Sequence, residues 1–362
     1  MENKQRNNKA FTLIELIVAL GILVIVISFA GEIFKVSIDS QRTAMANAEI
    51  MQKFRAITSQ LNSDFQGLNK DGEIFVVWKA VPLQNKEYPD NDLDGYERFD
   101  RIMFFAEGDF QAYQRYVWGG GPPSENVIRG NIARICYMIA KDGTTGPEVL
   151  DKPKRILART QHVLTDDKEL PYQDPGSFSA EQWFQWNNLL QYDKISLEQW
   201  KKLPVNVKVD MLSVICDVDI VTGGSIGTST VDKNLRGVSI DPGDPNSMHM
   251  LLCEGVGEFK IQGWDNTQKT WLPEVDPDGN GNLSDSHFYH NDSNNVPGVL
   301  YPWPLGASSI NHINYPSEQI TRDNFNSVPG LGRALKFTFT LFDSRGIIKG
   351  GRTFSHIVYL DN

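Results

Sequence analysis

The sequence predicts an α+β fold in which one long N-terminal helix packs against an antiparallel β-sheet head. Three observations support this prediction. The chain opens with a mainly apolar run (Phe11–Ala30), continues with a proline-free amphipathic stretch (31–65), and then changes to segments rich in β-branched and aromatic residues. We expect the first half of the helix (11–31) to span a membrane and the second half (32–66) to carry the head (67–362).

The apolar run is long enough to cross a bilayer, because twenty residues at ~1.5 Å rise per residue reach about 30 Å, the thickness of the hydrocarbon core. The leader before it (1–10) holds Lys4, Arg6 and Lys9 against one acid, which favours keeping that end in the cytoplasm. Glu15 lies one turn into the run, where burying an unpaired carboxylate in lipid costs ~2.5–3.5 kcal/mol or more.

A small residue, Ala10, stands before the apolar run, whereas an ordinary secretory signal has its cleavage site after the run. Cleavage there would leave the helix on the mature chain, with the new amine of Phe11 able to pair with Glu15 of a neighbouring subunit. The stretch KAFTLIE resembles the processing site of type IV prepilins and type II secretion pseudopilins, with Ala10 in place of the usual glycine. The resemblance implies that a prepilin peptidase cuts between Ala10 and Phe11 and methylates Phe11. A plain signal anchor is the alternative.

The helix is predicted to continue past the membrane as an amphipathic spine. Apolar residues recur there at spacings of three and four, which is the period of one helix face. The stripe consists of Ile50, Phe54, Ile57, Leu61 and Phe65. A helix from about Phe11 to Phe65 would be roughly 80 Å long at ~1.5 Å per residue, and Gly67 with the turn after it would end the helix.

The head is predicted to consist mainly of antiparallel strands, with turn signals such as Gly108-Asp109 between them. The expected strands are 73–80, 101–107, 110–118, 133–140, 155–164, 207–220 and 248–264, followed by a C-terminal hairpin of 334–343 and 352–360 with a turn at 344–346.

A helical insertion (171–204) and a long polar loop (276–316) interrupt the strands. Two Ser-x-x-Gln patterns, beginning at Ser179 and Ser196, are capping boxes that predict two short helices in the insertion. Its aromatic residues, Trp200 among them, either form a partner surface or anchor the insertion to the head.

Three head segments resemble the J-type minor pseudopilin of type II secretion systems. They contain an Arg-x-x-Tyr strand (Arg134 and Tyr137), a Glu-Gly-Val strand (Glu254–Val256) and a closing Gly-Arg-Thr-Phe hairpin (Gly351–Phe354). The insertion and the long loop have no counterpart in that family. The resemblance implies a single-pass inner-membrane protein with its C-terminal head in the periplasm.

The same resemblance implies a structural rather than catalytic role, near the tip of a short periplasmic filament that drives protein export across the outer membrane. The implied partners are prepilin peptidase and other minor and major pseudopilins. A minor pilin of a type IV pilus, active in assembly priming or adhesion, is the first alternative. A membrane-tethered enzyme or binding module is the second, and a cleft lined by tryptophans such as Trp264 and Trp271 would favour it.

The formal net charge of −10 argues against nucleic-acid binding through a basic face. Cys136, Cys216 and Cys253 are an odd count in apolar, strand-like runs, so one disulfide with a free thiol and three buried thiols both remain open. The sequence contains no nucleophile elbow, HExxH motif or P-loop. His287 and His290, with Asp292 nearby, are a candidate transition-metal site.

Two acidic segments have the spacing of calcium-binding loops. In each, oxygen-bearing side chains occupy positions 1, 3 and 5 and a glycine, Gly95 or Gly281, occupies position 6, as in an EF-hand. Neither has the glutamate expected at position 12, so we predict non-EF-hand Ca²⁺ loops that stabilise the head, with solvated acidic turns as the alternative. The predicted ligands are Asp90, Asp92, Asp94, Tyr96 (through its carbonyl), Asp100, Asp276, Asp278, Asn280, Asn282 and Asp285.

Overall fold

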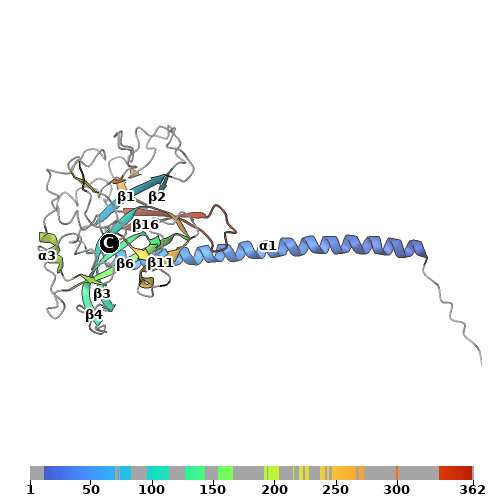
Figure 1. The fold of residues 1–362 in the computed structure, drawn as a ribbon, viewed down its shortest axis with the longest axis horizontal. Helices are drawn as coiled ribbons and strands as arrows, with labels where there is room; N and C mark the ends of the chain where they lie inside the picture. Colours follow the sequence, from blue (N-terminus) through green and yellow to red (C-terminus); the bar gives the residue numbers. More distant parts are fainter. Residues whose placement is uncertain are drawn as a thin grey trace, which may run out of the picture.

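A single long helix projects from a β-rich head (Figure 1). The computed structural model describes residues 12–69, 72, 74–82, 96–113, 127–142, 154–165, 191–193, 195–203, 215, 220–222, 225–227, 237–240, 243, 247–265, 269–272, 299–300 and 334–360. The combination of one long helix with antiparallel sheets confirms the predicted α+β class.

The helices are α1 (Leu13–Gln66), α3 (Leu197–Lys202) and the 3₁₀ turn η4 (Met248–Met250). The strands of the first half are β1 (Phe75–Pro82), β2 (Tyr96–Arg98), β3 (Arg101–Tyr113), β4 (Val127–Ile139), β5 (Lys141–Asp142), β6 (Ile156–Leu164) and β7 (Tyr192–Asp193). Those of the second half are β8 (Ile220–Thr222), β9 (Ser225–Gly227), β10 (Ser239–Ile240), β11 (Leu251–Glu254), β12 (Val256–Asp265), β13 (Thr270–Leu272), β14 (Val299–Leu300), β15 (Ala334–Leu341) and β16 (Arg352–Tyr359).

Helix α1 runs without interruption for 54 residues. The sequence placed its start at Phe11, but the helix begins at Leu13 because Thr12, in an extended conformation, is its N-cap. Its C-cap is Gly67, as predicted. The apolar stripe also behaves as predicted, because Ile50, Ile57 and Leu61 are fully buried in the head.

The larger sheet has the strand order β11-β6-β4-β3-β1-β14, with β2 added to β1 and β7 added to β6. Strands β3 and β4 form its longest ladder, which runs from Ile102–Tyr137 to Tyr113–Val127. The predicted turn at Gly108-Asp109 is wrong. The register shifts between Glu107 and Phe110, so these residues form a bulge inside β3 and the strand continues.

A second sheet has the order β13-β12-β15-β16 and contains the predicted C-terminal hairpin. Its turn begins at Ser344, and Gly346 takes a positive φ of 64° there, a conformation that suits glycine. The strand predicted at 248–264 is divided in the structure. It starts with the 3₁₀ turn η4 and is then split at Gly255 into β11 and β12.

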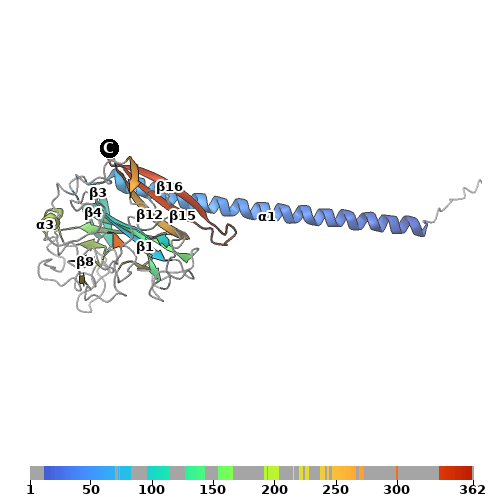
Figure 2. The same ribbon diagram turned by 90° about the horizontal axis from the view of Figure 1, so that it is seen from above.

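The main core lies where α1 meets both sheets. Ile50, Leu61 and Phe65 of α1 belong to one buried cluster with Phe104 of β3 and Phe337 of β15, and the rings of Phe65 and Phe104 stack at 4.4 Å. In Figure 2 the second half of α1 lies beside β15 and β16, whereas the first half extends away from the head. The core therefore fixes only the second half of the helix.

A second core covers the other face of the larger sheet. Trp200 of α3 is 1% exposed and packs its ring edge against Phe105 at 5.4 Å, so this tryptophan anchors the insertion to the head. Ser196 and Gln199 form the predicted capping box. The first predicted box, beginning at Ser179, lies outside the described residues. Ile215, within the predicted strand 207–220, is helical, and most of that segment lies outside the described residues.

Candidate functional site on the N-terminal helix

The start of α1 is closed by a capping box. The amide and hydroxyl of Thr12 both donate to Oε2 of Glu15, at 2.9 and 3.0 Å, and the Glu15 amide donates to the Thr12 hydroxyl at 3.3 Å. The pattern is Thr-x-x-Glu, the same type of signal that predicted the Ser196 cap, although sequence reasoning did not apply it here. The Glu15 carboxylate thus has a partner within its own chain before it meets another subunit.

An apolar surface covers α1 from Leu13 to Ile38. Its large side chains are 48–75% exposed, and nothing in the described head covers them. This helix is the one candidate membrane span found among the described residues, with a mean hydropathy of 2.9 over its most apolar window. Such a surface is unstable in water, so it requires lipid or the apolar helices of other subunits.

The first turn of this helix and the apolar surface that follows coincide with a known motif. Residues 5–31 match the model of the prokaryotic N-terminal methylation motif. The N-terminal segment is therefore similar to that of prepilin-type proteins. The motif supports membership of the type IV pilin superfamily, with cleavage by a prepilin peptidase, N-methylation of phenylalanine and assembly with other pilin-like subunits. No curated protein and no solved structure gives a significant match.

C-terminal to the methylation motif, two polar clusters join α1 to the head. The first is buried at the C-terminal end of the helix, where the carboxylate of Asp64 accepts a hydrogen bond from the Tyr137 hydroxyl. Arg159 donates to both oxygens of the same carboxylate at 2.7 Å. Burial and the neighbouring carboxylate raise the pKa of Tyr137 well above its usual value, so its hydroxyl remains a donor.

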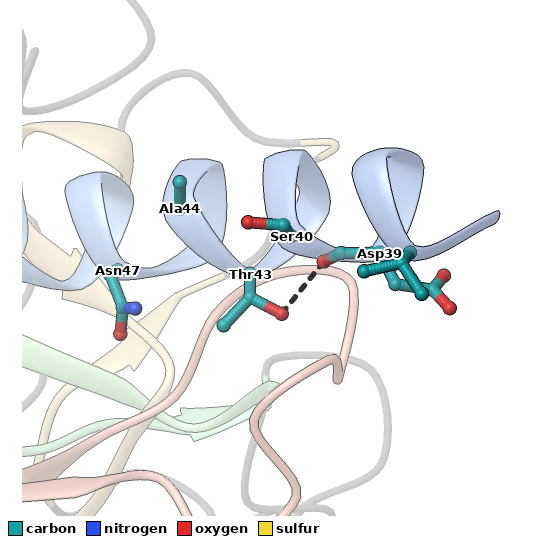
Figure 3. Close-up of a pocket in the computed structure, with 6 residues that line it drawn as sticks. Asp39, Ser40, Thr43, Ala44 and Asn47 are labelled. Atoms are coloured by element: carbon teal, nitrogen blue, oxygen red, sulfur yellow. Dashed lines mark hydrogen bonds between the residues drawn. The ribbon is translucent and has the colours of Figure 1, made fainter. Parts of the chain in front are cut away.

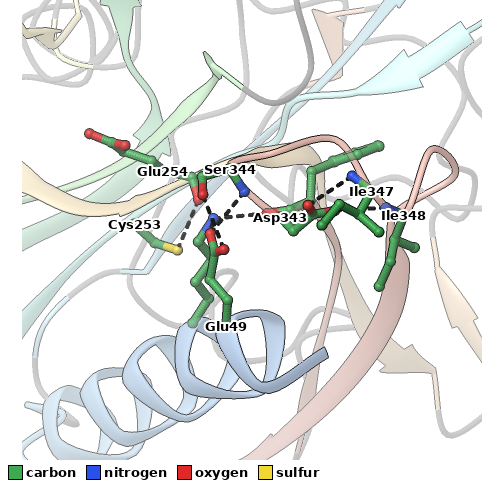
Figure 4. Close-up of polar contacts among 9 residues, drawn as sticks. Glu49, Cys253, Glu254, Asp343, Ser344, Ile347 and Ile348 are labelled. Carbon is green, nitrogen blue, oxygen red and sulfur yellow. Dashed lines mark hydrogen bonds and ion pairs between the residues drawn. The ribbon is translucent and has the colours of Figure 1, made fainter. Parts of the chain in front are cut away.

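The second cluster joins the middle of α1 to the β15–β16 turn (Figure 4). Glu49 accepts hydrogen bonds from the amide and hydroxyl of Ser344, at 2.9 and 3.1 Å. Lys53 pairs with Glu49 at 2.9 Å and donates to the carbonyl of Phe342 at 2.8 Å. Although burial opposes the change, these contacts lower the pKa of Glu49.

The turn itself is ordered by Asp343. Its two carboxylate oxygens accept hydrogen bonds from the amides of Ile347 and Ile348, each at 2.9 Å. Burial acts against these hydrogen bonds, but the amides lower the pKa of Asp343. The turn is thus held both internally and by α1, which adds a second cluster to the attachment at Asp64. A single further contact joins Asn62 of α1 to His356 of β16 at 2.8 Å.

The residues of the Arg-x-x-Tyr strand are interior residues in the structure. Tyr137 belongs to the Asp64 cluster, and Arg134 pairs with Asp193 of β7 at 2.7 Å on the other face of the sheet. His162 lies 3.2 Å from the same carboxylate. This strand therefore contacts the helix on one face of the sheet and the Asp193 side chain of β7 on the other.

Most of the predicted calcium ligands lie outside the described residues, as do Ala10 and Phe11. Tyr96 is the first residue of β2, and Asp100 is fully buried. Asp100 does not fit its predicted role, because its carboxylate pairs with Arg98 and accepts the Ile261 amide at 2.6 Å. Among the described residues, no group of three or more potential metal-binding side chains is found.

The tryptophans and cysteines that the structure describes are mainly packing residues. Trp264 and Trp271 meet edge to face at 5.2 Å on the second sheet, and Trp200 is buried elsewhere, so these three do not line a common cleft. Cys136 and Cys253 are buried in different core clusters. Burial raises the pKa of Cys253 to about 11. Cys216, the Trp183 region and His287 with His290 lie outside the described residues.

Proposed function

We propose that this chain is a minor pseudopilin of a type II secretion system, near the tip of a periplasmic filament that drives protein export. The observation that carries the proposal is the methylation motif on a helix whose first half is exposed and apolar and whose second half is locked into a β head. The head segments at Arg134–Tyr137, Glu254–Val256 and Gly351–Phe354 favour the secretion system over a type IV pilus by their resemblance to the J type.

In this proposal the helix anchors the chain in the inner membrane with the head in the periplasm, and the protein acts mechanically rather than as an enzyme. Force on the exposed half of α1 reaches the head through Asp64 and Glu49. Because these attachments lie about 22 Å apart along the helix, at ~1.5 Å per residue, they resist both pulling and tilting of the helix.

The first test is the N-terminal residue of the full chain expressed with and without a prepilin peptidase. A mature chain beginning at N-methylated Phe11 only with the peptidase supports the proposed processing. Co-purification should then recover other pseudopilins. Recovery of a major type IV pilin instead would assign the chain to a pilus, and a chain still beginning at Met1 would contradict processing at Ala10.

We also propose that the acidic segments beginning at Asp90 and Asp276 bind Ca²⁺ as structural ions. Crowded carboxylates repel one another until a divalent cation neutralises them, so Ca²⁺ should stabilise the folded head. At a free concentration of about 100 times Kd, one site contributes ~2.7 kcal/mol.

Adding a calcium chelator should therefore lower the Tm of the detergent-solubilised chain by several degrees. The variant Asp90→Asn with Asp276→Asn should have the lower Tm already and should not respond to the chelator. An unchanged Tm of the unmodified chain would refute calcium binding.

A further inference from the structure

An open groove lies along α1 just before the helix enters the head. It is lined by Val36, Asp39, Ser40, Thr43, Ala44 and Asn47. Figure 3 shows Asp39, Thr43 and Asn47 on the same side of the helix. Their spacing of four, followed by a step of three to Ile50, leads into the buried stripe of the core. The groove is therefore on the helix face that packs against the head farther along.

The groove offers hydrogen-bond acceptors that the chain itself does not use. Oδ1 of Asn47 is buried and has no hydrogen-bond partner, which is costly unless a donor is supplied from outside. The hydroxyl of Thr43 donates to the Asp39 backbone carbonyl at 2.9 Å. The Asp39 carboxylate is exposed and has no ion pair with any described residue. An acceptor-rich groove with a negative charge favours a cationic donor.

The charges on this part of α1 indicate where such a donor comes from. Acidic residues stand at Glu32 and Asp39, and basic residues stand at Lys35 and Arg42, so each sign repeats after seven residues. In the described structure none of the four forms an ion pair within its own helix. Two parallel helices with this pattern can place the base of one against the acid of the other.

The position of the groove also favours another subunit over lipid. Asp39 lies about 39 Å from Leu13 along the helix at ~1.5 Å per residue, which is beyond a hydrocarbon core of about 30 Å. The groove starts at Val36, at the C-terminal end of the exposed apolar surface that begins within the methylation motif (5–31). The Asp39 carboxylate repels lipid phosphates.

We propose that this groove binds a lysine or arginine side chain from the helix of a neighbouring pilin-like subunit. The cation pairs with Asp39. A second donor of the same helix, about 12 Å farther along at ~1.5 Å per residue, reaches Oδ1 of Asn47. The inference rests on the proposed assembly function and adds the contact that sets the register of the neighbouring helix. This contact lies about 36 Å from Glu15 along the helix at ~1.5 Å per residue, so it acts in addition to the proposed Glu15 pairing.

The test is photo-cross-linking of the full-length chain in cells that contain the complete filament system. Benzoylphenylalanine replaces Ser40 in the groove. It replaces Met45 as the matched control, which is 54% exposed and, two residues from Thr43, faces the opposite side of α1. A third probe at Leu20 reports on assembly of the apolar segment. Cross-linked products are identified by mass spectrometry.

We expect the Ser40 probe to link to the helix of another pilin-like subunit and the Met45 probe to link to it much less. The Asp39→Lys variant should reduce the Ser40 product about tenfold or more, because like charges would then oppose each other at the interface. Asp39→Glu should retain the product, and Asn47→Leu should reduce it.

Two results would overturn the groove proposal while leaving assembly intact. One is a Ser40 probe that links only to lipid while the Leu20 probe links to subunits. The other is a Ser40 product that Asp39→Lys does not change. Absence of subunit cross-links from both Ser40 and Leu20 would instead overturn the proposed filament function, and the groove proposal with it.

Discussion

Glu15 has one partner in the single chain and a second in the proposed filament, and its substitution tests the second. In the single chain its carboxylate closes the helix N-terminus on Thr12, and in a filament the amine of a processed Phe11 can replace that contact. We predict that Glu15→Ala is still cleaved but enters filaments poorly, as measured by the yield of subunit cross-links. The control Thr12→Val removes the cap hydroxyl but keeps the carboxylate, so it should assemble nearly normally. Normal assembly of Glu15→Ala would contradict the pairing.

Substituting Tyr137 tests how much one hydroxyl group of the buried Asp64 cluster contributes to stability. Tyr137→Phe removes only the hydroxyl, and the ring keeps its place in the core. A hydrogen bond to a charged group contributes about 1.5–3 kcal/mol, so the variant should lose about that much stability in denaturant unfolding of the detergent-solubilised chain. Tyr359→Phe, at an exposed tyrosine of β16, is the matched control and should be unchanged. Equal stability of both variants would show that the hydroxyl is not needed.

At the scale of elements, the contacts of Asp193 in strand β7 make the stability of the head sensitive to acid. Burial favours the neutral form of Asp193, but the Arg134 guanidinium holds the pKa of this carboxyl far below its usual value. Burial and then the charge of Arg134 lower the pKa of His162, although Asp193 opposes this shift. Both groups bind protons more tightly in the unfolded chain, so stability is lost as pH falls. His162 contributes first, below the unfolded histidine value of about 6.5.

The denaturant midpoint of unfolding should therefore decrease as the pH is lowered from 7.5 to 5. His162→Gln should make that decrease smaller, because glutamine does not titrate. His356, whose pKa burial also lowers, adds a slope of the same sign, so His356→Gln is the comparison variant. The charged and titratable groups at His162 are Arg134, Asp193 and His249. A pH profile unchanged by His162→Gln would exclude this histidine as the source.

Elements with a local signal were predictable from the sequence, and contacts between distant elements were not. The helix, its apolar stripe and the Ser196 cap follow from patterns within a few residues. The bulge at Gly108 was missed because a Gly-Asp pair favours a turn unless a partner strand holds both sides, as β4 does. The Asp64–Arg159 pair joins residues 95 positions apart, so only the fold brings them together.

For the whole molecule, losing both the Glu49 and the Asp64 attachments of α1 should lower the free energy of unfolding more than losing either one. They lie about 22 Å apart along α1 at ~1.5 Å per residue and share no partner, so their effects on stability should add. We predict a loss of up to about 1 kcal/mol for the partly exposed Glu49→Gln and a larger loss for the buried Asp64→Asn. Denaturant unfolding of both single variants and the double variant gives the coupling directly.

The loss of protein export in the Glu49→Gln, Asp64→Asn double variant should exceed the loss that its lower stability alone explains. At a temperature where the double variant remains folded, it should be processed and inserted normally, but protein export should fall because the helix can shift relative to the head. A variant of matched stability elsewhere, such as Val358→Ala in the buried core, should keep its export. Equal export by these two variants would mean that the attachments stabilise the fold without transmitting force, and the apolar core between α1 and the sheets would then carry the load.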